Sequence, residues 1–209
     1  MDGVNQIQVK PAIGLTFSSV LRSIVRQDPD VILVGEMRDL ETAKICVISA
    51  LTGHLVLSSL HTNSAASSIT RLLEMGIEDY LLTSTVNAVL SQRLVRKLCR
   101  HCREPYTPAM ELVRELKLDQ CTDQDEITLY RPVGCEACNS TGYRGRQSII
   151  ELLIMTDDIR KLVHGSNDAR EIESAAIRSG MRTIYQDGCD KALAGSTSME
   201  EVLRVVQEA

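Results

Sequence analysis

Four cysteines in two close pairs are the residues of this sequence best suited to a specific chemistry. Cys99 and Cys102 are separated by two residues, as are Cys135 and Cys138, and 32 residues lie between the two pairs. Two intervening residues let both sulfurs of a pair reach one ion from a tight turn, and two pairs supply the four thiolates of a tetrahedral structural zinc. The spacing therefore predicts a Zn²⁺ site at these four cysteines, with an additional element in the long insert.

Disulfide bonds are the alternative use of these cysteines, and the sequence disfavours them. The chain does not open with an apolar signal sequence, and Cys46 lies in a helical apolar pattern. Seven cysteines would also leave one unpaired. These features are typical of a reducing compartment, so we expect three reduced thiols outside the zinc site: Cys46, Cys121 and Cys189.

Basic residues cluster around the first cysteine pair, and two explanations fit them. A zinc ion with four thiolate ligands carries a formal charge of about −2, which nearby cations offset. The same cations would also suit a docking surface for an acidic partner. The residues concerned are Arg93, Arg96, Lys97, Arg100 and Arg103.

Length and composition limit the fold and the partners. A chain of 209 residues with 44% hydrophobic residues buries a real core, and predicts one domain plus an appendage. Only 3% of the residues are aromatic, so the core is aliphatic. The net charge of −5 disfavours nucleic acid as the main partner. No apolar stretch approaches the roughly 18 residues of a membrane span.

Helix and strand patterns alternate through the first half, which predicts an α/β fold. The aliphatic run at 31–34 is typical of a strand buried on both faces, and 55–60 is similar. The second half predicts a helix at 109–117, extended chain at 142–154 and a series of helices separated by glycines. We expect helices over 16–27 (N-cap Thr16), 40–52 (capped by Asp39), 64–75, 79–97, 156–164, 168–179, 184–194 and 199–208.

Polar residues follow both predicted strands of the first half, where parallel sheets bind ligands. Glu36 follows the strand at 31–34, and His61 follows the strand at 55–60. An acidic residue at the end of an apolar strand holds magnesium or orients the attacking water in nucleoside triphosphatases. Acidic residues also end strands simply to meet solvent, and a histidine at a strand end is commonly structural. Neither residue determines the function alone.

Longer stretches of sequence are far more specific. Residues 26–39 and 52–63 closely resemble the Walker B and histidine boxes of the secretion ATPases that drive type II secretion and type IV pilus assembly. Residues 92–96, which lead into the cysteines, and residues 142–146 match the same family. The four cysteines favour its secretion or pilus-extension branch over the retraction ATPases. Residues 180–188 favour type II secretion or a pilus-assembly paralogue.

The resemblance implies an architecture and a setting. The fold is then the carboxyl-terminal part of a RecA-like P-loop NTPase domain at 1–98, a zinc subdomain at 99–138, and a return strand with a helical region at 139–209. It implies a cytoplasmic hexamer that uses ATP and Mg²⁺. The hexamer would be peripheral to the inner membrane, held there by platform proteins of the secretion or pilus system.

The resemblance also assigns roles to single residues. Glu36 corresponds to the Walker B acid, which acts on the magnesium and water around the γ-phosphate. His61 would sense or contact the γ-phosphate, and His54 would support that strand. Gly35 stands where many other ATPases keep a metal-binding aspartate. Four arginines are candidates for charge stabilisation within or between subunits: Arg22, Arg26, Arg38 and Arg71.

One departure from the family pattern limits what this chain is expected to do. The phosphate-binding motif G-x-x-x-x-G-K-[ST] does not occur in the sequence, nor does the family's aspartate box. The chain thus resembles the carboxyl-terminal half of the motor, and alone it should not turn over ATP. We expect exposed apolar surface where further strands would pair.

Two other functions remain as alternatives to part of a motor. The first is a non-catalytic, zinc-bearing module that docks on the secretion platform or on an intact motor. The second is a zinc-ribbon nucleic-acid binder, which the acidic charge and the scarcity of aromatic stacking residues disfavour.

Overall fold

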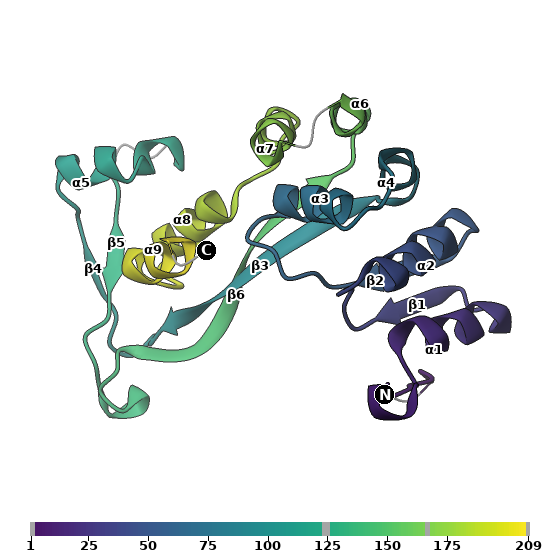
Figure 1. Cartoon of the computed structure of the whole chain (residues 1–209). Coiled ribbons are helices and arrows are strands. Elements are labelled where there is room, and N and C mark those ends of the chain that lie inside the picture. Colours follow the sequence, from purple (N-terminus) through teal and green to yellow (C-terminus); the bar gives the residue numbers. More distant parts are fainter. Residues whose placement is uncertain (1–2, 123–125, 166–167, 208–209) are drawn as a thin grey trace. The chain divides into compact units, whose positions relative to one another are not determined.

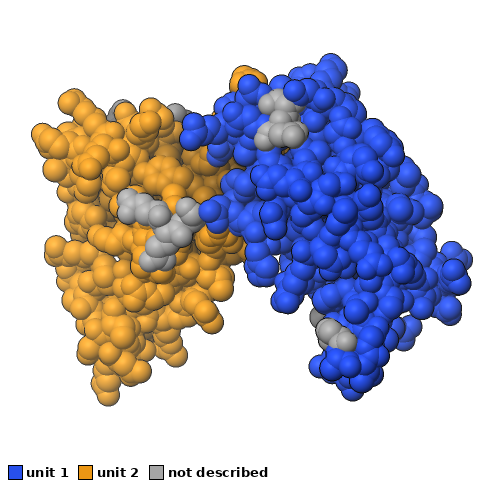
Figure 2. Space-filling model, in the orientation of Figure 1, with its two compact units in different colours: residues 1–89, 154–176 blue, residues 90–153, 177–209 orange. Residues whose placement is uncertain are grey.

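The computed structural model describes residues 3–122, 126–165 and 168–207, and its order of elements is that of an α/β protein (Figure 1). Contacts divide the chain into two compact units, residues 1–89 with 154–176 and residues 90–153 with 177–209 (Figure 2). The helices are α1 Phe17–Ile24, α2 Leu40–Leu51, α3 Ala65–Glu74, α4 Asp79–Thr85, α5 Met110–Glu115, α6 Asp157–Gly165, α7 Ala169–Arg178, α8 Ile184–Leu193 and α9 Met199–Gln207. The strands are β1 Val31–Val34, β2 Leu55–Ser58, β3 Ala88–Leu98, β4 Glu104–Tyr106, β5 Leu129–Arg131 and β6 Tyr143–Ile154.

The first unit is built on the parallel pair β1–β2, in which Val31 lies opposite Leu55 and Val34 lies opposite Ser58. Both predicted helix caps are confirmed. The Thr16 hydroxyl accepts a hydrogen bond from the Ser19 backbone at the start of α1. The Asp39 carboxylate accepts one from the Thr42 backbone, 2.8 Å away, at the start of α2. Capping of this kind satisfies backbone donors that the first helical turn leaves free.

The two faces of the β1–β2 sheet differ in their exposure. One face packs against α1 and α2 in a core that contains Leu21, Ile32, Val34 and Cys46. Side chains of the opposite face remain exposed, up to 77% for Leu33. The prediction that both strands are buried on both faces is therefore wrong for the described residues, because the helices cover one face only. The exposed set is Val31, Leu33, Leu55 and Leu57.

The prediction of one helix over 79–97 is wrong beyond α4, because residues 88–98 form strand β3 and pair with β6. Leu90 and Leu94 are four residues apart, a spacing that one helix face and one strand face share. The burial separates the two periods. Residues 88, 90, 92, 94 and 96 are exposed, whereas the residues between them (89, 91, 93 and 95) are half-buried or buried, which is the alternation of a strand.

The second unit contains the rest of the β3–β6 pair, the antiparallel pair β4–β5, and helices α5, α8 and α9. One core of this unit joins residues of α5, the 3₁₀ turn Leu118–Gln120, β5, α8 and α9: Val113, Leu118, Leu129, Cys189, Ala192, Met199 and Val202. A smaller core packs Val95 and Ile149 of the β3–β6 pair against Val205 of α9. Burial of these aliphatic side chains, at about 25 cal/mol per Å² of apolar surface, is what holds α8 and α9 to the strands.

Most of the remaining elements follow the sequence prediction with small shifts, but strands β4 and β5 were not predicted. The extended segment predicted at 142–154 is β6, and the helix predicted at 109–117 is the shorter α5. Helices α6 to α9 match their predictions within a residue or two, and the predicted end at residue 208 lies outside the described residues. Within the described chain, every helix falls short of the length and hydrophobicity needed to cross a membrane.

Candidate functional site

Glu36 and His61 lie together beyond the carboxyl ends of β1 and β2. Parallel pairing places those two ends at the same edge of the sheet. The Met37 backbone N–H donates to the Ser59 carbonyl at 3.0 Å, and the Ser59 hydroxyl donates to the Gly35 carbonyl at 2.7 Å. These two bonds fix the segments that carry the acid and the histidine.

The Glu36 carboxylate therefore lies between the side chains of His61 and Arg38. Glu36 Oε2 lies 3.2 Å from His61 Nε2, and Glu36 Oε1 lies 2.5 Å from Arg38 Nη2. The Glu36 side chain is 19% exposed, whereas the His61 side chain is 88% exposed. The structure thus brings three of the predicted site residues into direct contact, with the acid partly sheltered and the two partners facing solvent.

The electrostatics of this cluster keep the acid ionised. The hydrogen bond from Arg38 holds the pKa of the Glu36 carboxyl below its ordinary value, against the opposing effect of partial desolvation, and His61 lowers it further. Glu36 in turn raises the pKa of Arg38. An ionised carboxylate at a strand end can coordinate Mg²⁺ through oxygen or accept a hydrogen bond from a water molecule.

The four predicted cysteine ligands converge in the second unit. Their sulfur atoms all lie within 4.8 Å of one another. Three separations are 3.8 Å: Cys99 to Cys135, Cys102 to Cys138, and Cys135 to Cys138. A tetrahedral zinc with Zn–S bonds of about 2.3 Å requires sulfurs about 3.8 Å apart, whereas a disulfide requires about 2.05 Å. The donor set therefore fits a four-thiolate metal ion, and all seven cysteines are free thiols.

Backbone N–H groups point at two of these sulfurs, those of Cys102 and Cys138. Gly134 N donates to Cys102 Sγ at 3.3 Å, and both Cys135 N and Gly142 N donate to Cys138 Sγ at 3.2 Å. Burial raises the pKa of the Cys138 thiol, but the N–H donors outweigh it and lower the pKa to about 6. Such bonds favour the thiolate, which is the form that binds a metal.

Gly142 is a residue of this centre that the cysteine spacing alone does not reveal. It has φ +75°, and a Cβ placed on it would lie 2.4 Å from Cβ of Pro132. Only glycine fits this close approach while its N–H reaches Cys138. A glycine four residues after the last cysteine of a pair is the sequence signal that points to this role.

Two of the thiols outside the centre, Cys46 and Cys189, are buried in the surroundings of unreactive cysteines. Burial raises the pKa of Cys46 to about 11 and that of Cys189 to about 12. A thiol with a pKa this high is protonated at neutral pH, and the protonated form is a poor nucleophile and a poor ligand.

Comparison with known proteins decides the family. The model of the type II/IV secretion system protein family matches residues 1–204. The chain belongs to this family. The resemblance inferred from the strand-end and cysteine motifs is thereby confirmed.

The curated relatives of this chain include proteins of type II secretion and of type IV pilus assembly. It is 57% identical over its whole length to type II secretion system protein E of Xanthomonas campestris pv. campestris, and 48% identical to type II secretion system ATPase E of Vibrio cholerae. It is 51% identical, over 96% of its length, to the type IV pilus assembly ATPase PilB of Thermus thermophilus. The chain spans 37%, 41% and 22% of these relatives, respectively.

Solved structures share the fold. The Legionella pneumophila ATPase DotB matches all of the chain with a TM-score of 0.66 at 20% identity, over 48% of DotB. The pilus retraction motor PilT, solved with bound ADP, matches 91% of the chain with a TM-score of 0.58 at 25% identity, over 43% of PilT. The α/β prediction therefore agrees with the fold of known motor ATPases.

The other predicted site residues lie away from Glu36 in this secretion-family chain. His54 precedes β2, at the opposite end of the strand from His61, and its Nδ1 lies 2.9 Å from the Ser49 carbonyl oxygen. Arg22 pairs with Glu41 at 2.7 Å, and Arg71 pairs with Glu74 at 3.6 Å. Arg26 is exposed in the 3₁₀ turn Val25–Gln27 that follows α1. Roles for these residues at a subunit boundary remain predictions.

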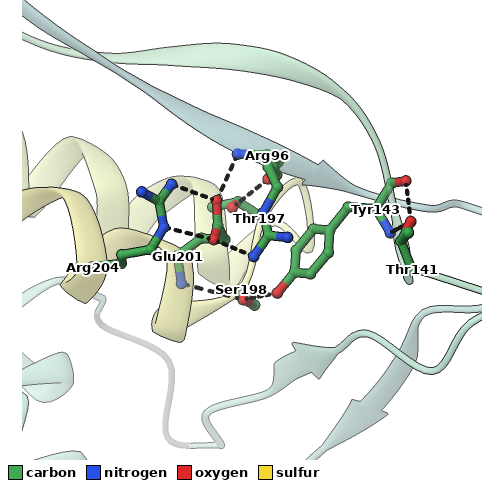
Figure 3. A network of polar contacts seen from close by, with 7 residues as sticks. All are labelled: Arg96, Thr141, Tyr143, Thr197, Ser198, Glu201 and Arg204. Carbon is green, nitrogen blue, oxygen red and sulfur yellow. Dashed lines mark hydrogen bonds and ion pairs between the residues drawn. The ribbon is translucent and has the colours of Figure 1, made fainter.

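Part of the predicted basic cluster is occupied by contacts within the second unit. Arg96 Nη2 donates to Glu201 Oε1 at 2.6 Å, and Arg204 Nε donates to the same oxygen at 3.0 Å (Figure 3). Arg103 donates to the Gly195 carbonyl, and its guanidinium lies 4.9 Å from the centre of the Tyr130 ring. Arg96 and Arg103 therefore bind helix α9 and the turn before it.

Proposed function

We propose that this chain is the carboxyl-terminal half of a hexameric, cytoplasmic ATPase motor that powers type II secretion or type IV pilus assembly. The observation that carries the proposal is the contact between Glu36 and His61 at the carboxyl ends of two parallel strands, in a chain of the type II/IV secretion family. The motor would be peripheral to the inner membrane, bound there by platform proteins.

In this proposal each residue of the strand-end cluster has a distinct task. Glu36 coordinates Mg²⁺ or orients the water that attacks the γ-phosphate. His61 is 88% exposed and lies against Glu36, so it is free to turn toward the γ-phosphate while it stays near the acid. Arg38 neutralises Glu36 when nucleotide is absent and stabilises developing negative charge when nucleotide is present. Bound Mg²⁺ would supply charge neutralisation on the phosphate oxygens.

The same proposal predicts that the chain is inactive alone. Phosphoryl transfer depends on positioning and electrostatic stabilisation, and a Gly-rich loop with its lysine normally cradles the β- and γ-phosphates. That motif is not part of these 209 residues. Glu36 and His61 therefore supply one side of the nucleotide site and depend on further residues for the other.

A chimera tests the proposal. The region of the Xanthomonas type II secretion system protein E that matches this chain would be replaced by residues 1–209. We expect the chimera to hydrolyse ATP and restore secretion, whereas the isolated chain shows neither activity. A folded chimera that neither hydrolyses ATP nor supports secretion would contradict the proposal, and so would clear ATP turnover by the highly purified isolated chain.

One observation favours the second candidate function, a non-catalytic module that docks through its metal-bearing unit. The four cysteines lie in a unit with a core of its own and are not part of the unit that contains Glu36. In that case the isolated chain would bind platform proteins, or an intact motor, with a stoichiometric metal ion. Binding that persists after Glu36→Gln, without rescue of hydrolysis by the chimera, would favour this function.

A further inference from the structure

The turn between α8 and α9 is bound by the residues on both sides of the first cysteine pair. Leu98, which precedes Cys99, donates its backbone N–H to the Ser196 carbonyl at 3.0 Å. Arg103, which follows Cys102, donates to the Gly195 carbonyl. Any change in the separation or orientation of these two cysteines is therefore transmitted to adjacent residues of one turn.

Gly142 and Tyr143, four and five residues after the second cysteine pair, connect it to the start of α9. Gly142 N binds Cys138 Sγ, and the next residue, Tyr143, places its hydroxyl 2.8 Å from the Ser198 hydroxyl (Figure 3). Gly142 also accepts a hydrogen bond from Cys99 N at 2.9 Å, which joins the two cysteine pairs. The first cysteine pair is thus adjacent in sequence to two groups that bind the α8–α9 turn, Leu98 and Arg103, whereas the second pair is joined to the turn through Gly142 and Tyr143.

Gly195 is the residue of the turn that packs against Arg103 and Tyr130. It has φ +67°, and a Cβ placed on it would lie 2.8 Å from Arg103 Nη1 and 2.8 Å from two carbons of the Tyr130 ring. Real Cβ atoms do not approach other atoms this closely. A side chain at this position would therefore displace Arg103 from the Gly195 carbonyl.

We propose that metal binding at the four cysteines is thermodynamically linked to the order of the α8–α9 helix pair, with Arg103 and Gly195 as the positioning residues. A metal ion would fix Cys99 and Cys102 relative to each other and so fix Leu98 and Arg103, which bind the turn. The turn then forms its contacts at a smaller cost in conformational entropy. Because linkage is reciprocal, the intact turn raises metal affinity by the same factor by which metal stabilises the turn.

This linkage goes beyond the proposed function and does not depend on it, because it concerns the second unit alone. It assigns α8 and α9 a role in metal binding, which the sequence does not indicate because both helices lie far from Cys99 along the chain. Loss of metal would loosen the helix pair, and damage to the turn would weaken metal binding. The coupling expected from typical linked sites is about tenfold in affinity.

The experiment compares the full chain loaded with Zn²⁺ and stripped by a chelator. Hydrogen exchange followed by mass spectrometry reports the protection of α8 and α9, and competition with a chromophoric chelator reports Zn²⁺ affinity at fixed pH. We expect α8 and α9 to exchange faster in the stripped protein. Gly195→Ala and Arg103→Ala should each lower Zn²⁺ affinity about tenfold, the range typical of coupled sites.

Gly145→Ala is the matched control. Gly145 has φ +78°, close to that of Gly195, but a Cβ on it meets nothing within 4 Å. Alanine at position 145 has the same unfavourable positive φ as alanine at position 195 but makes no steric clash, so the Zn²⁺ affinity of Gly145→Ala should stay near that of the wild type. Arg103→Ala removes only a side chain and remains informative if Gly195→Ala fails to fold. In the double variant the two losses should not add, because both remove one contact.

Several results would overturn the linkage. They are unchanged exchange of α8 and α9 on metal removal, equal loss of affinity in Gly145→Ala and Gly195→Ala, wild-type affinity in Arg103→Ala, and failure of the wild-type chain to bind Zn²⁺. None of these results bears on hydrolysis by the chimera, so the two proposals fail separately.

Discussion

At the scale of the residue, the carboxylate of Glu36 combines partial shelter with a fixed negative charge. Its bond to Arg38 and its contact with His61 keep the pKa low, so it is ionised throughout the neutral range. A residue that only ended a strand would have no need of two such partners. The arrangement suits a group that must be negatively charged when magnesium and nucleotide arrive.

Glu36→Gln tests this role in the chimeric motor. The amide keeps the size of the side chain but removes the charge that organises magnesium and water, so nucleotide should still bind while hydrolysis falls. Loss of a transition-state electrostatic contact typically costs about 10²- to 10³-fold in rate. Glu171→Gln, at an exposed position of α7 in the same unit, is the control for a generic loss of negative charge. A turnover near wild type in a folded Glu36→Gln chimera would make the catalytic assignment wrong.

At the scale of the element, Glu201 joins helix α9 to strand β3. Its side chain is 2% exposed and accepts hydrogen bonds from Arg204, from the Arg96 side chain and from the Arg96 backbone N–H at 3.0 Å (Figure 3). Burial would raise the pKa of Glu201, but these donors outweigh it and lower the pKa to about 2. The network thus binds the ionised form far more strongly than the protonated form.

This difference predicts how stability depends on pH. The pKa of Glu201 is lower in the folded state than in the unfolded state, so its contribution is complete above the ordinary value of 4.5 and is lost as pH falls toward about 2. A shift of this size corresponds to on the order of 3 kcal/mol at neutral pH. Glu201→Gln should lower the free energy of unfolding, measured with denaturant, most at pH 7 and least near pH 2.

The control for this prediction is the neighbouring Glu200→Gln, since Glu200 is exposed on the same helix. It should leave both the stability and its pH dependence close to wild type. Both variants keep all four cysteine ligands, so loss of metal in acid affects them equally. A pH-independent difference between Glu201→Gln and the wild type would contradict the electrostatic explanation.

Metal removal is the second test at this scale. Cys135→Ser should reduce bound zinc well below one ion per chain and loosen residues 99–138, because a structural zinc site contributes its binding energy to folding. The first unit, which contains β1 and β2, should keep its protection from hydrogen exchange. Cys121→Ser is the matched control, since Cys121 lies outside the four-sulfur cluster. Elemental analysis of the wild-type chain that finds far less than one zinc would contradict the site.

The elements show which parts of the structure the sequence can predict. The caps at Thr16 and Asp39 and the cysteine pairs are local signals. The structure confirms both caps and brings the four cysteine sulfurs together. Leu90 and Leu94 were ambiguous because their spacing fits both a helix and a strand. The bond between Arg96 and Glu201 joins residues 105 positions apart, and no local pattern indicates it. Contacts of this kind depend on how the elements pack, which single-sequence periodicity does not contain.

At the scale of the whole molecule, the exposed face of the β1–β2 sheet is the feature that most needs a partner. Val31, Leu33, Leu55 and Leu57 are large aliphatic side chains on that face, and the strand register sets them beside one another in pairs. Exposed aliphatic surface on a short sheet favours association. The chain spans only 37% and 41% of the type II secretion relatives from Xanthomonas and Vibrio, so in the proposed motor we expect the remaining sequence to cover this face.

Leu33→Lys tests whether this face is covered in the complete motor. In the isolated chain Leu33 is 77% exposed, so the substitution should leave the thermal unfolding temperature nearly unchanged and reduce self-association, measured by sedimentation velocity. In the chimeric motor the same lysine would lie in an apolar interior, and loss of a buried leucine alone costs about 1.5–3 kcal/mol. The chimera should therefore unfold at a lower temperature and lose activity.

Met110→Lys is the control, because Met110 is also exposed but belongs to α5 in the second unit. It should be neutral for self-association in the isolated chain and for stability in the chimera. Equal stability of the Leu33→Lys and wild-type chimeras would mean that the β1–β2 face stays open to solvent in the motor. Leu33→Lys is therefore expected to reduce self-association of the isolated chain and to destabilise the chimera. A face that stays exposed to solvent in the motor would show the first effect without the second.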